Sequence, residues 1–203
     1  VDNWGGTDLW VNNCDIHHNS QGVYCWGNAL FNYNTIRDNT SGLSYGAGGV
    51  YAAGGTFSYN TIKNNSCGGC DLGGGGIKVD NANIDHNIIS GNSGGGAGGL
   101  YLYSGGDVTN NIIFNNTGPY AVYFDQNGAN TFTGNIIADG LTYFNQTELE
   151  GSFTNNVFAG GLIGTLEFED DNADFSKNAI LNSPGDGSYD YLKIYGDSYN
   201  EDL

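Results

Sequence analysis

Apolar and polar residues recur in one short pattern along almost the whole chain. The pattern is apolar-x-x-Asn-x-Ile-x-x-Asn, and one complete copy reads Phe31-x-x-Asn34-x-Ile36-x-x-Asn39. Other copies, complete or partial, begin at Val11, Phe57, Ile84, Val108, Phe132, Phe153 and Phe175. Their central apolar residues lie 20 to 27 residues apart. A repeat in this range predicts a solenoid, in which each unit buries its apolar face against its neighbours.

Within each copy the apolar and polar residues alternate with period two and not with the period of a helix. Ile84 and Ile89 are therefore expected on two short strands that are separated by a bend. A third strand is predicted by the pattern Gly-Gly-apolar-x-apolar, which follows at 48–52, 75–79 and 98–102. The 35 glycines and 2 prolines suit many tight turns between stacked strands. Each coil should thus contain three short strands and three turns.

The first Asn of each copy is expected at a sharp turn, because Asn tolerates the left-handed backbone conformation better than other non-glycine residues. In stacked coils these side chains should pair their amides as a ladder along the axis. The predicted ladder contains Asn34, Asn60, Asn87, Asn111, Asn135, Asn156 and Asn178, with Cys14 in the first copy. The central apolar residues should stack inside: Ile16, Ile36, Ile62, Ile89, Ile113, Ile137, Phe158 and Ile180.

Three strands in a coil of this length resemble the right-handed parallel β-helix of the pectate-lyase-like superfamily, specifically its generic parallel β-helix repeats. The resemblance extends from Val11 to about Ile194. It implies an all-β solenoid of about eight three-strand coils that forms a single domain over residues 1–203. The alternative, a β-sandwich with Asn-rich turns, does not explain a repeat without hairpin turns. The matching residues are structural, so the resemblance indicates the fold and says little about activity.

The net charge is −17, which makes nucleic acid an improbable partner. No stretch is long enough to span a membrane, and no signal peptide is visible. Because the chain opens with Val1, we expect a processed mature chain or a fragment. The densest acidic cluster is a candidate Ca²⁺ site, since this ion prefers oxygen ligands, although the acidity also fits solubility or a saline habitat. The cluster consists of Glu167, Glu169, Asp170, Asp171 and Asp174, and no other cofactor is predicted.

The four cysteines and four glycosylation sequons favour an extracellular or cell-surface location. Cys67 and Cys70 lie in a Gly-rich loop without a second Cys pair, so a local disulfide is preferred to a redox or zinc site. Cys14 and Cys25 are expected to be buried apolar fillers. The sequons begin at Asn39, Asn64, Asn115 and Asn145, and an Asn-rich chain also produces such triplets by chance.

In enzymes of the superfamily that the chain resembles, the active groove usually follows the third type of strand. Outward residues of this strand are predicted to form two columns. The first contains Tyr24, Tyr51, Lys78, Tyr101 and Tyr123, with Glu167 and Lys193 further on; the second contains Trp26, Asp80, Tyr103, Asp125 and Glu169. Such rows of aromatic residues suit sugar binding or a protein contact, or are simply a solvent-facing strand surface.

Three functions remain open on these residues. Lys78 with Asp80 and Asp125 is a weak candidate for the catalytic base of a polysaccharide lyase or glycoside hydrolase acting on an acidic polysaccharide. The catalytic complement is otherwise thin, which favours a protein that is not an enzyme. No capping helix is evident, although Trp10 could plug one end. Uncapped ends expose strand edges, so the preferred prediction is head-to-tail self-association into a filament or sheath. The alternative is a carbohydrate-binding module that uses the aromatic columns and binds a polysaccharide.

Overall fold

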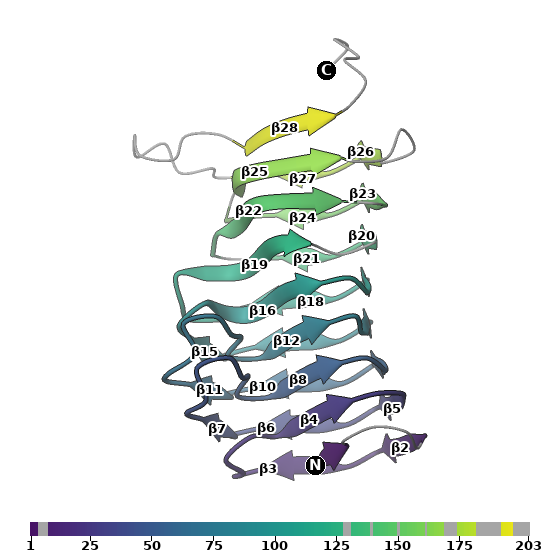
Figure 1. The fold of residues 1–203 in the computed structure, drawn as a ribbon, viewed down its shortest axis with the longest axis vertical. Coiled ribbons are helices and arrows are strands. Elements are labelled where there is room, and N and C mark those ends of the chain that lie inside the picture. The colour runs from purple at the N-terminus through teal and green to yellow at the C-terminus, as the bar shows by residue number, and fades with distance from the viewer. Residues whose placement is uncertain are drawn as a thin grey trace.

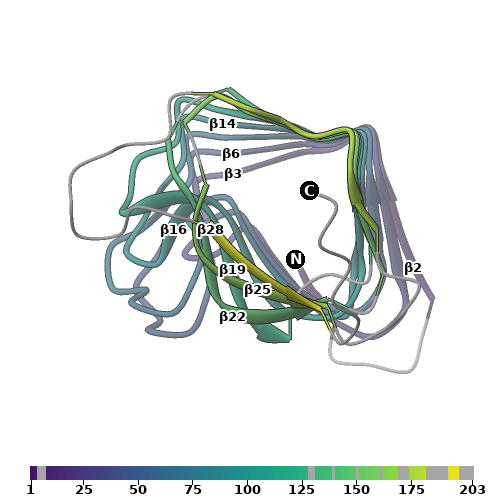
Figure 2. The ribbon, with the colours of Figure 1, turned by 90° about the horizontal axis from the view of Figure 1, so that it is seen from above.

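The computed structural model of the chain is a parallel β-solenoid (Figure 1). It describes residues 1–3, 8–127, 131–138, 140–149, 151–160, 162–168, 174–181 and 192–196. All regular elements in these residues are strands, and every strand pair is parallel. The fold class predicted from the repeat is therefore confirmed. Seen along the axis, the sheets form the walls of the solenoid (Figure 2). The buried apolar side chains fill its interior.

Three long sheets form these walls. The nine-stranded sheet consists of β1 (Asp2–Asn3), β4 (Val23–Trp26), β8 (Val50–Ala53), β12 (Ile77–Asp80), β16 (Ala97–Ser104), β19 (Tyr120–Asn127), β22 (Thr142–Leu149), β25 (Leu162–Phe168) and β28 (Leu192–Gly196). The β2–β26 sheet consists of β2 (Leu9–Asn12), β5 (Ala29–Asn32), β9 (Thr56–Ser58), β13 (Asn83–Asp85), β17 (Asp107–Thr109), β20 (Thr131–Thr133), β23 (Ser152–Thr154) and β26 (Asp174–Ser176). The β3–β27 sheet consists of β3 (Asp15–His17), β6 (Thr35–Arg37), β10 (Thr61–Lys63), β14 (Ile88–Ser90), β18 (Ile112–Phe114), β21 (Ile136–Ile137), β24 (Val157–Phe158) and β27 (Ala179–Ile180).

A small fourth sheet was not predicted. It contains β7 (Thr40–Ser41), β11 (Ser66–Cys67) and β15 (Ser93–Gly94), each placed just after a strand of the β3–β27 sheet. The coils that carry it have longer connections to the nine-stranded sheet, and these connections bulge outward at the side of the solenoid (Figure 1).

The core is built from columns of like residues in consecutive coils. Ile36 pairs with Ile62, which pairs with Ile89, and all three side chains are fully buried. Phe31 stacks on Phe57 with ring centroids 4.7 Å apart. Burial of each such side chain contributes roughly 1.5–3 kcal/mol. The predicted apolar column is thus confirmed as far as Phe158. Ile180 differs, because it lies on the terminal strand β27 and is 42% exposed.

The predicted Asn ladder is present and deeply buried. From Asn34 to Asn156, each amide nitrogen donates to the amide oxygen of the next coil and to a backbone carbonyl of the preceding one. Asn87 Nδ2, for example, donates to Asn111 Oδ1 at 3.1 Å and to the carbonyl of Phe57 at 2.8 Å. A second ladder, formed by the last Asn of each copy, runs parallel to it through Asn39, Asn65, Asn92 and Asn116. These bonds satisfy amides that would otherwise be buried without partners.

The sequence led us to expect the ladder asparagines in the left-handed conformation, and this prediction is wrong. Positive φ angles occur at the residue immediately before each ladder position, namely Asn13 (before Cys14), Tyr33, Tyr59, His86, Asn110, Gly134, Asn155 and Lys177. The left-handed residue turns the chain, so that the following Asn points inward to the ladder. Asn is therefore required at the ladder for its hydrogen bonds and not for its backbone conformation.

Replacement of one ladder Asn tests this distinction. Asn87→Ala removes the amide that bonds Phe57, Asn60 and Asn111, so the Phe57 carbonyl and the Asn60 N–H of the preceding coil both lose this partner. We expect a loss of about 2–4 kcal/mol in the free energy of unfolding, measured by urea denaturation. Asn13→Gly is the control, because Asn13 is exposed with φ of 55° and glycine adopts this angle freely. Equal losses in the two variants would contradict the ladder's role.

Candidate functional site

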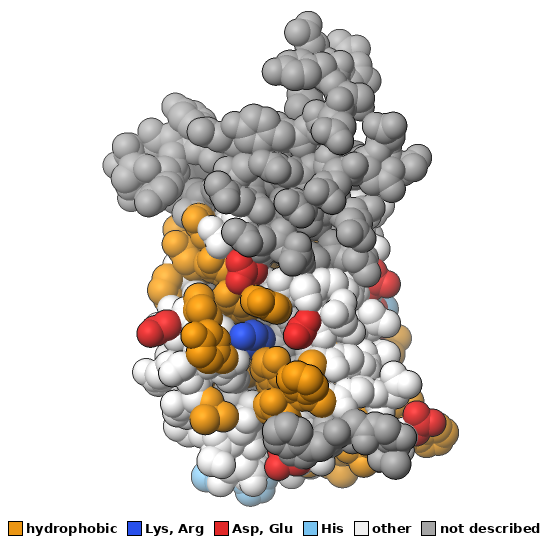
Figure 3. All heavy atoms as spheres, in the orientation of Figure 1, with side chains coloured by type: hydrophobic (Ala, Val, Ile, Leu, Met, Phe, Trp, Pro, Cys, Tyr) orange, Lys and Arg blue, Asp and Glu red, His pale blue; other side chains and the backbone are white. Residues whose placement is uncertain are grey.

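The outer face of the nine-stranded sheet carries the first predicted column. Tyr24 pairs with Tyr51, and the column continues through Lys78, Tyr101 and Tyr123 in the predicted order. The structure adds Tyr143, which pairs with Tyr123. Figure 3 shows this face, where hydrophobic side chains gather around a basic group with acidic groups beside it.

Two residues predicted for the end of this column lie elsewhere. Tyr143 pairs with Ile163, whereas Glu167 pairs with Glu148 and Tyr195. Lys193 pairs with Thr165 and is therefore not in line with Glu167. The position in line with Tyr143 is Ile163, four residues before Glu167, because β25 (Leu162–Phe168) begins before the segment 165–168 from which Glu167 was predicted.

The second predicted column is also interrupted. Trp26 pairs with Ala53, and Asp80 pairs with Ser104, so Tyr103 has no place in line with Asp80. The register of β16 shifts on both of its neighbours at this point. The bulge moves Tyr103 outward, where its side chain is 49% exposed.

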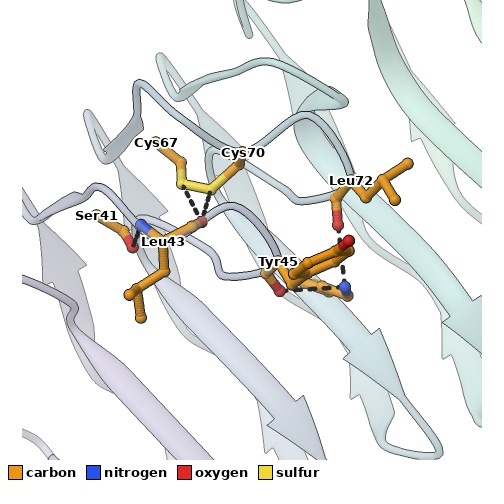
Figure 4. Close-up of a disulfide and its surroundings, with 7 residues drawn as sticks. Ser41, Leu43, Tyr45, Cys67, Cys70 and Leu72 are labelled. Carbon is orange, nitrogen blue, oxygen red and sulfur yellow. Dashed lines mark hydrogen bonds between the residues drawn. A yellow bond between two sulfur atoms is a disulfide. The ribbon is translucent and has the colours of Figure 1, made fainter.

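Lys78 lies at the centre of this face but is only 5% exposed. Its ammonium group donates to the backbone carbonyls of Tyr45 at 3.1 Å and Leu72 at 2.9 Å (Figure 4). The rings of Tyr45, Tyr51, Tyr101 and Tyr103 surround it at 5.3–5.8 Å from the nitrogen. We call this arrangement the lysine cage. It places the cation against four aromatic rings, which attract it electrostatically.

Two loops cover the lysine cage, and a disulfide fixes one of them. Tyr45 belongs to the loop after β7, and Leu72 belongs to the loop after β11. The Cys67–Cys70 disulfide closes the start of the second loop, and both sulfur atoms lie against the carbonyl oxygen of Leu43 in the first (Figure 4). The predicted local disulfide is thus present. Because the loops fold over the sheet, Lys78 and Tyr101 are buried although they face outward.

This environment does not suit Lys78 as a catalytic base. Burial lowers the pKa of its ammonium group, while the negative charges of Asp80 and Asp125 act in the opposite direction. The nitrogen is nevertheless held by two carbonyls beneath the surface, where a sugar carbon cannot reach it. The geometry therefore favours a role in joining the two loops to the sheet.

Two carboxylates flank the lysine cage. Asp125 accepts hydrogen bonds from the Tyr101 hydroxyl at 2.8 Å and from the Asn145 amide at 3.2 Å. Asp80 accepts one from the Ser104 hydroxyl. Burial, with the nearby charge of Asp80, raises the pKa of Tyr51 to about 12, and burial together with Asp125 raises the pKa of Tyr123 to about 12. Burial and the bond to Asp125 also raise the pKa of Tyr101.

The tyrosines on this face stack on one another. Tyr24 and Tyr51 have ring centroids 5.0 Å apart, and Tyr101 and Tyr123 are 4.7 Å apart, with interplanar angles of 13° and 11°. A separation close to the strand spacing means that the ring faces point along the axis toward the neighbouring coils. The faces are thus largely occupied within the protein, and the ring edges and hydroxyls point outward. Free aromatic surface comes mainly from Trp26, Tyr45 and Tyr103, which are 48%, 67% and 49% exposed.

Most of the predicted calcium cluster lies outside the described residues. This applies to Glu169, Asp170 and Asp171, whereas Glu167 lies on β25 and the exposed Asp174 on β26. In the part of the chain that the structure describes, no group of three or more His, Cys, Asp or Glu residues could hold a metal ion. Calcium binding at 167–174 stays a prediction.

The remaining cysteines and the sequons differ in exposure. Cys25 is buried as predicted, but Cys14 is exposed, because the first coil has no coil beneath it in the described residues. Asn39 is fully buried in the second ladder, so its amide is inaccessible to a glycosyltransferase in the folded protein. Asn64 and Asn115 are exposed, and Asn145 is half-buried. The sequons at the two exposed positions remain candidates.

Comparison with protein families settles the class of the chain. Residues 2–113 match the model of the right-handed β-helix region, which spans more than half of the 203 residues. The chain belongs to the right-handed β-helix family. The match extends over this β-helix from β1 into β18 and includes Lys78 and all four tyrosines of its cage. Searches of curated proteins and of solved structures give no significant match. Among the described residues, no helix is long and apolar enough to cross a membrane.

Tyr45, Tyr120 and Tyr143 were missed from the sequence. Tyr143 lies in the alternating segment 142–144, which fits the third strand but lacks the Gly pair used to find it. Tyr120 stacks on Tyr143 with centroids 4.7 Å apart. Tyr45 lies in a loop outside the repeat, so no periodic signal could have placed it beside Lys78.

Replacement of the caged lysine tests its structural role. Lys78→Met keeps the aliphatic stem but removes the cation that bonds the carbonyls of Tyr45 and Leu72. We expect a loss of about 1–3 kcal/mol in unfolding free energy, with faster amide hydrogen exchange in residues 68–73. Lys63→Met, on the outer face of β10, is the matched control. A Lys78 variant as stable as this control would refute the role.

The raised tyrosine pKa values predict sensitivity to alkali. The pKa of Tyr51 and Tyr123 is about 12 in the folded protein, compared with an ordinary value of 10.0. Because the folded value is the higher one, the neutral phenols stabilise the fold below pH 10, and this contribution is lost as the pH rises toward 12. We expect the melting temperature to fall over this window, and to fall less in Tyr51→Phe/Tyr123→Phe. A double variant with an unchanged pH profile would contradict the prediction; Tyr33→Phe is the control.

Proposed function

We propose that this β-helix is an extracellular, non-catalytic protein that binds a neutral polysaccharide on its nine-stranded sheet. The observation that carries the proposal is the aromatic surface around the lysine cage. We call this surface the tyrosine face, and it consists of Tyr24, Trp26, Tyr45, Tyr51, Tyr103, Tyr120, Tyr123 and Tyr143. Each of these side chains is at least partly exposed.

The tyrosine face suits a sugar polymer because it is rigid, amphipathic and elongated. Tyr24 stacks on Tyr51 and Tyr120 stacks on Tyr143, so these rings lose little side-chain entropy when a ligand binds. Trp26 and Tyr103 offer exposed apolar surface for the C–H faces of sugar rings, while the outward phenol edges offer hydroxyls for hydrogen bonds. An exposed aromatic surface on a monomer commonly marks a binding site.

The charges of the tyrosine face favour a neutral ligand over an acidic one. Asp80 and Asp125 flank the lysine cage, and the cation at its centre, Lys78, is buried and already bonded. With a net charge of −17, the protein also repels an anionic polymer at long range. This argument gives less support to a lyase or hydrolase of an acidic polysaccharide, which needs accessible cations or a free base.

Two features support the extracellular and non-catalytic parts of the proposal. The Cys67–Cys70 disulfide is of a kind that persists mainly outside the cytosol. Lys78 bonds the loops, and Tyr101, Asp80 and Asp125 are engaged in hydrogen bonds within the sheet. A surface or structural role in which the protein attaches to a glycan is consistent with both.

Self-association is a second candidate function, favoured by one observation. β2 and β3 end their sheets without a partner on one side in the described residues, and such edges can pair with another copy. The acidic charge of both halves opposes this contact, so millimolar calcium should promote it if residues 167–174 bind the ion. Light scattering with and without calcium tests this: a monomer in both conditions would refute it.

Paired variants on two sides of the solenoid test carbohydrate binding. Trp26→Ala/Tyr103→Ala removes exposed rings from the tyrosine face. Tyr33→Ala/Tyr59→Ala removes a stacked, exposed pair at the corner between the β2–β26 and β3–β27 sheets, away from this face. In affinity electrophoresis with neutral xylan, glucomannan and β-glucan, the first variant should lose at least tenfold in affinity, about 1.4 kcal/mol. The second should bind as the original protein does.

Three outcomes would contradict the proposal. The first is that the protein binds none of the neutral polymers. The second is that both double variants bind equally well, and the third is that both lose binding. Acidic polygalacturonate is included in the same gels. Stronger retention on this polymer than on the neutral ones would refute the charge argument.

A further inference from the structure

A depression on the β2–β26 sheet lies around the corner from the tyrosine face. Its volume is about 330 Å³. It is lined by Asp8, Trp10, Asn28, Ala29, Leu30, Gly55 and Thr56. These residues come from β2, β5, β9 and the turns that precede them. The volume lies at the lower end of the range for ligand sites, about 300–1,000 Å³, and suits a ligand of one or two sugar rings.

The depression arises from a decrease in side-chain size along one column. Trp10 pairs with Leu30, and Leu30 pairs with Thr56, so a tall side chain is followed by two shorter ones. Gly55 lowers the rim, because it has φ of 85° and a Cβ there would lie 2.7 Å from the carbonyl oxygen of Ala29. One side of the indole therefore stands above its neighbours.

Trp10 is the most exposed large hydrophobic residue of the described part of the chain, at 73%. The burial of Leu9, Trp10 and Val11 alternates, so Trp10 points outward. The suggestion from the sequence that Trp10 plugs the end of the solenoid is therefore wrong. Some exposed aromatics stack on a ring of the next coil, as Tyr33 does on Tyr59. Trp10 is followed by an aliphatic residue, and its indole makes no ring contact within the described residues.

We propose that this depression is a second sugar-binding subsite, which takes a neutral sugar ring on the indole of Trp10. The apolar face of the indole would pack against the C–H groups of the sugar ring, while the polar edge of the indole stays in contact with water. The Asp8 carboxylate, the Asn28 amide and the Thr56 hydroxyl line the same depression and would bond the sugar hydroxyls. Because Asp8 would repel the carboxylate of a uronate, the expected ligand is a neutral sugar.

The subsite deepens the proposed carbohydrate-binding function. Trp26 ends β4 on the tyrosine face, and Asn28 follows it two residues later at the rim of the depression. A polysaccharide bound on the tyrosine face could therefore place a branch or a chain end at Trp10. Two subsites on one chain increase affinity without a large interface.

Tryptophan fluorescence tests the subsite directly. The chain has three tryptophans, and Trp4→Phe/Trp26→Phe leaves Trp10 as the only one. This variant is titrated with neutral oligosaccharides of the gluco, manno, galacto and xylo series at up to millimolar concentration. We expect a saturable change in Trp10 emission with at least one series. Asp8→Ala in this background should weaken that response severalfold, and Lys63→Met should not change it.

Other outcomes separate this subsite from the tyrosine face and from a contact between copies. No saturable change with any of the four series would overturn the subsite, even if the tyrosine face binds polymer in gels. A response at Trp10 in a protein whose Trp26→Ala/Tyr103→Ala variant binds polymer unchanged would support the subsite and refute the tyrosine face. If the Trp10 emission depends on protein concentration in the absence of sugar, the sugar subsite is refuted and a contact between copies at Trp10 is favoured.

Discussion

The buried Asn ladders are the constraint on which the rest of this β-helix depends. Each ladder amide bonds both the amide and the backbone of adjacent coils, so a coil that slips by one residue loses several buried hydrogen bonds at once. Because two ladders run in parallel, the strands between them are held at both ends. The register that results determines which residues stack in every other column, including the columns of the tyrosine face.

Stacking in register has a consequence for function. When like aromatic residues occupy the same position in consecutive coils, their faces meet and only their edges remain for a ligand, as in Tyr24 and Tyr51. Free aromatic faces occur where the column is interrupted. Lys78 fills one interruption, the bulge near Tyr103 makes another, and the step from Trp10 to Leu30 makes a third. Places where the repeat fails are thus the places where this scaffold can bind something.

Lys78 shows how a charge can be accommodated on such a sheet. Its burial is costly, but two carbonyls and four tyrosine rings compensate for lost hydration. The same contacts draw two loops onto the sheet, and the Cys67–Cys70 disulfide restricts the loop that supplies Leu72. The cage therefore converts a flat sheet into a face with raised walls.

The sequence by itself determined the repeat, the solenoid, the first Asn ladder and the order of Tyr24, Tyr51, Lys78, Tyr101 and Tyr123. These features depend only on residue spacing, because stacking places equal positions above one another. The tertiary structure decided that Lys78 and Tyr101 are buried, that Tyr103 is not in line with Asp80, and that Trp10 stands over a depression. Loops that fold back over a sheet, bulges that shift register and neighbours of unequal size have no period. Their effect arises from contacts between coils, which spacing along the chain does not encode.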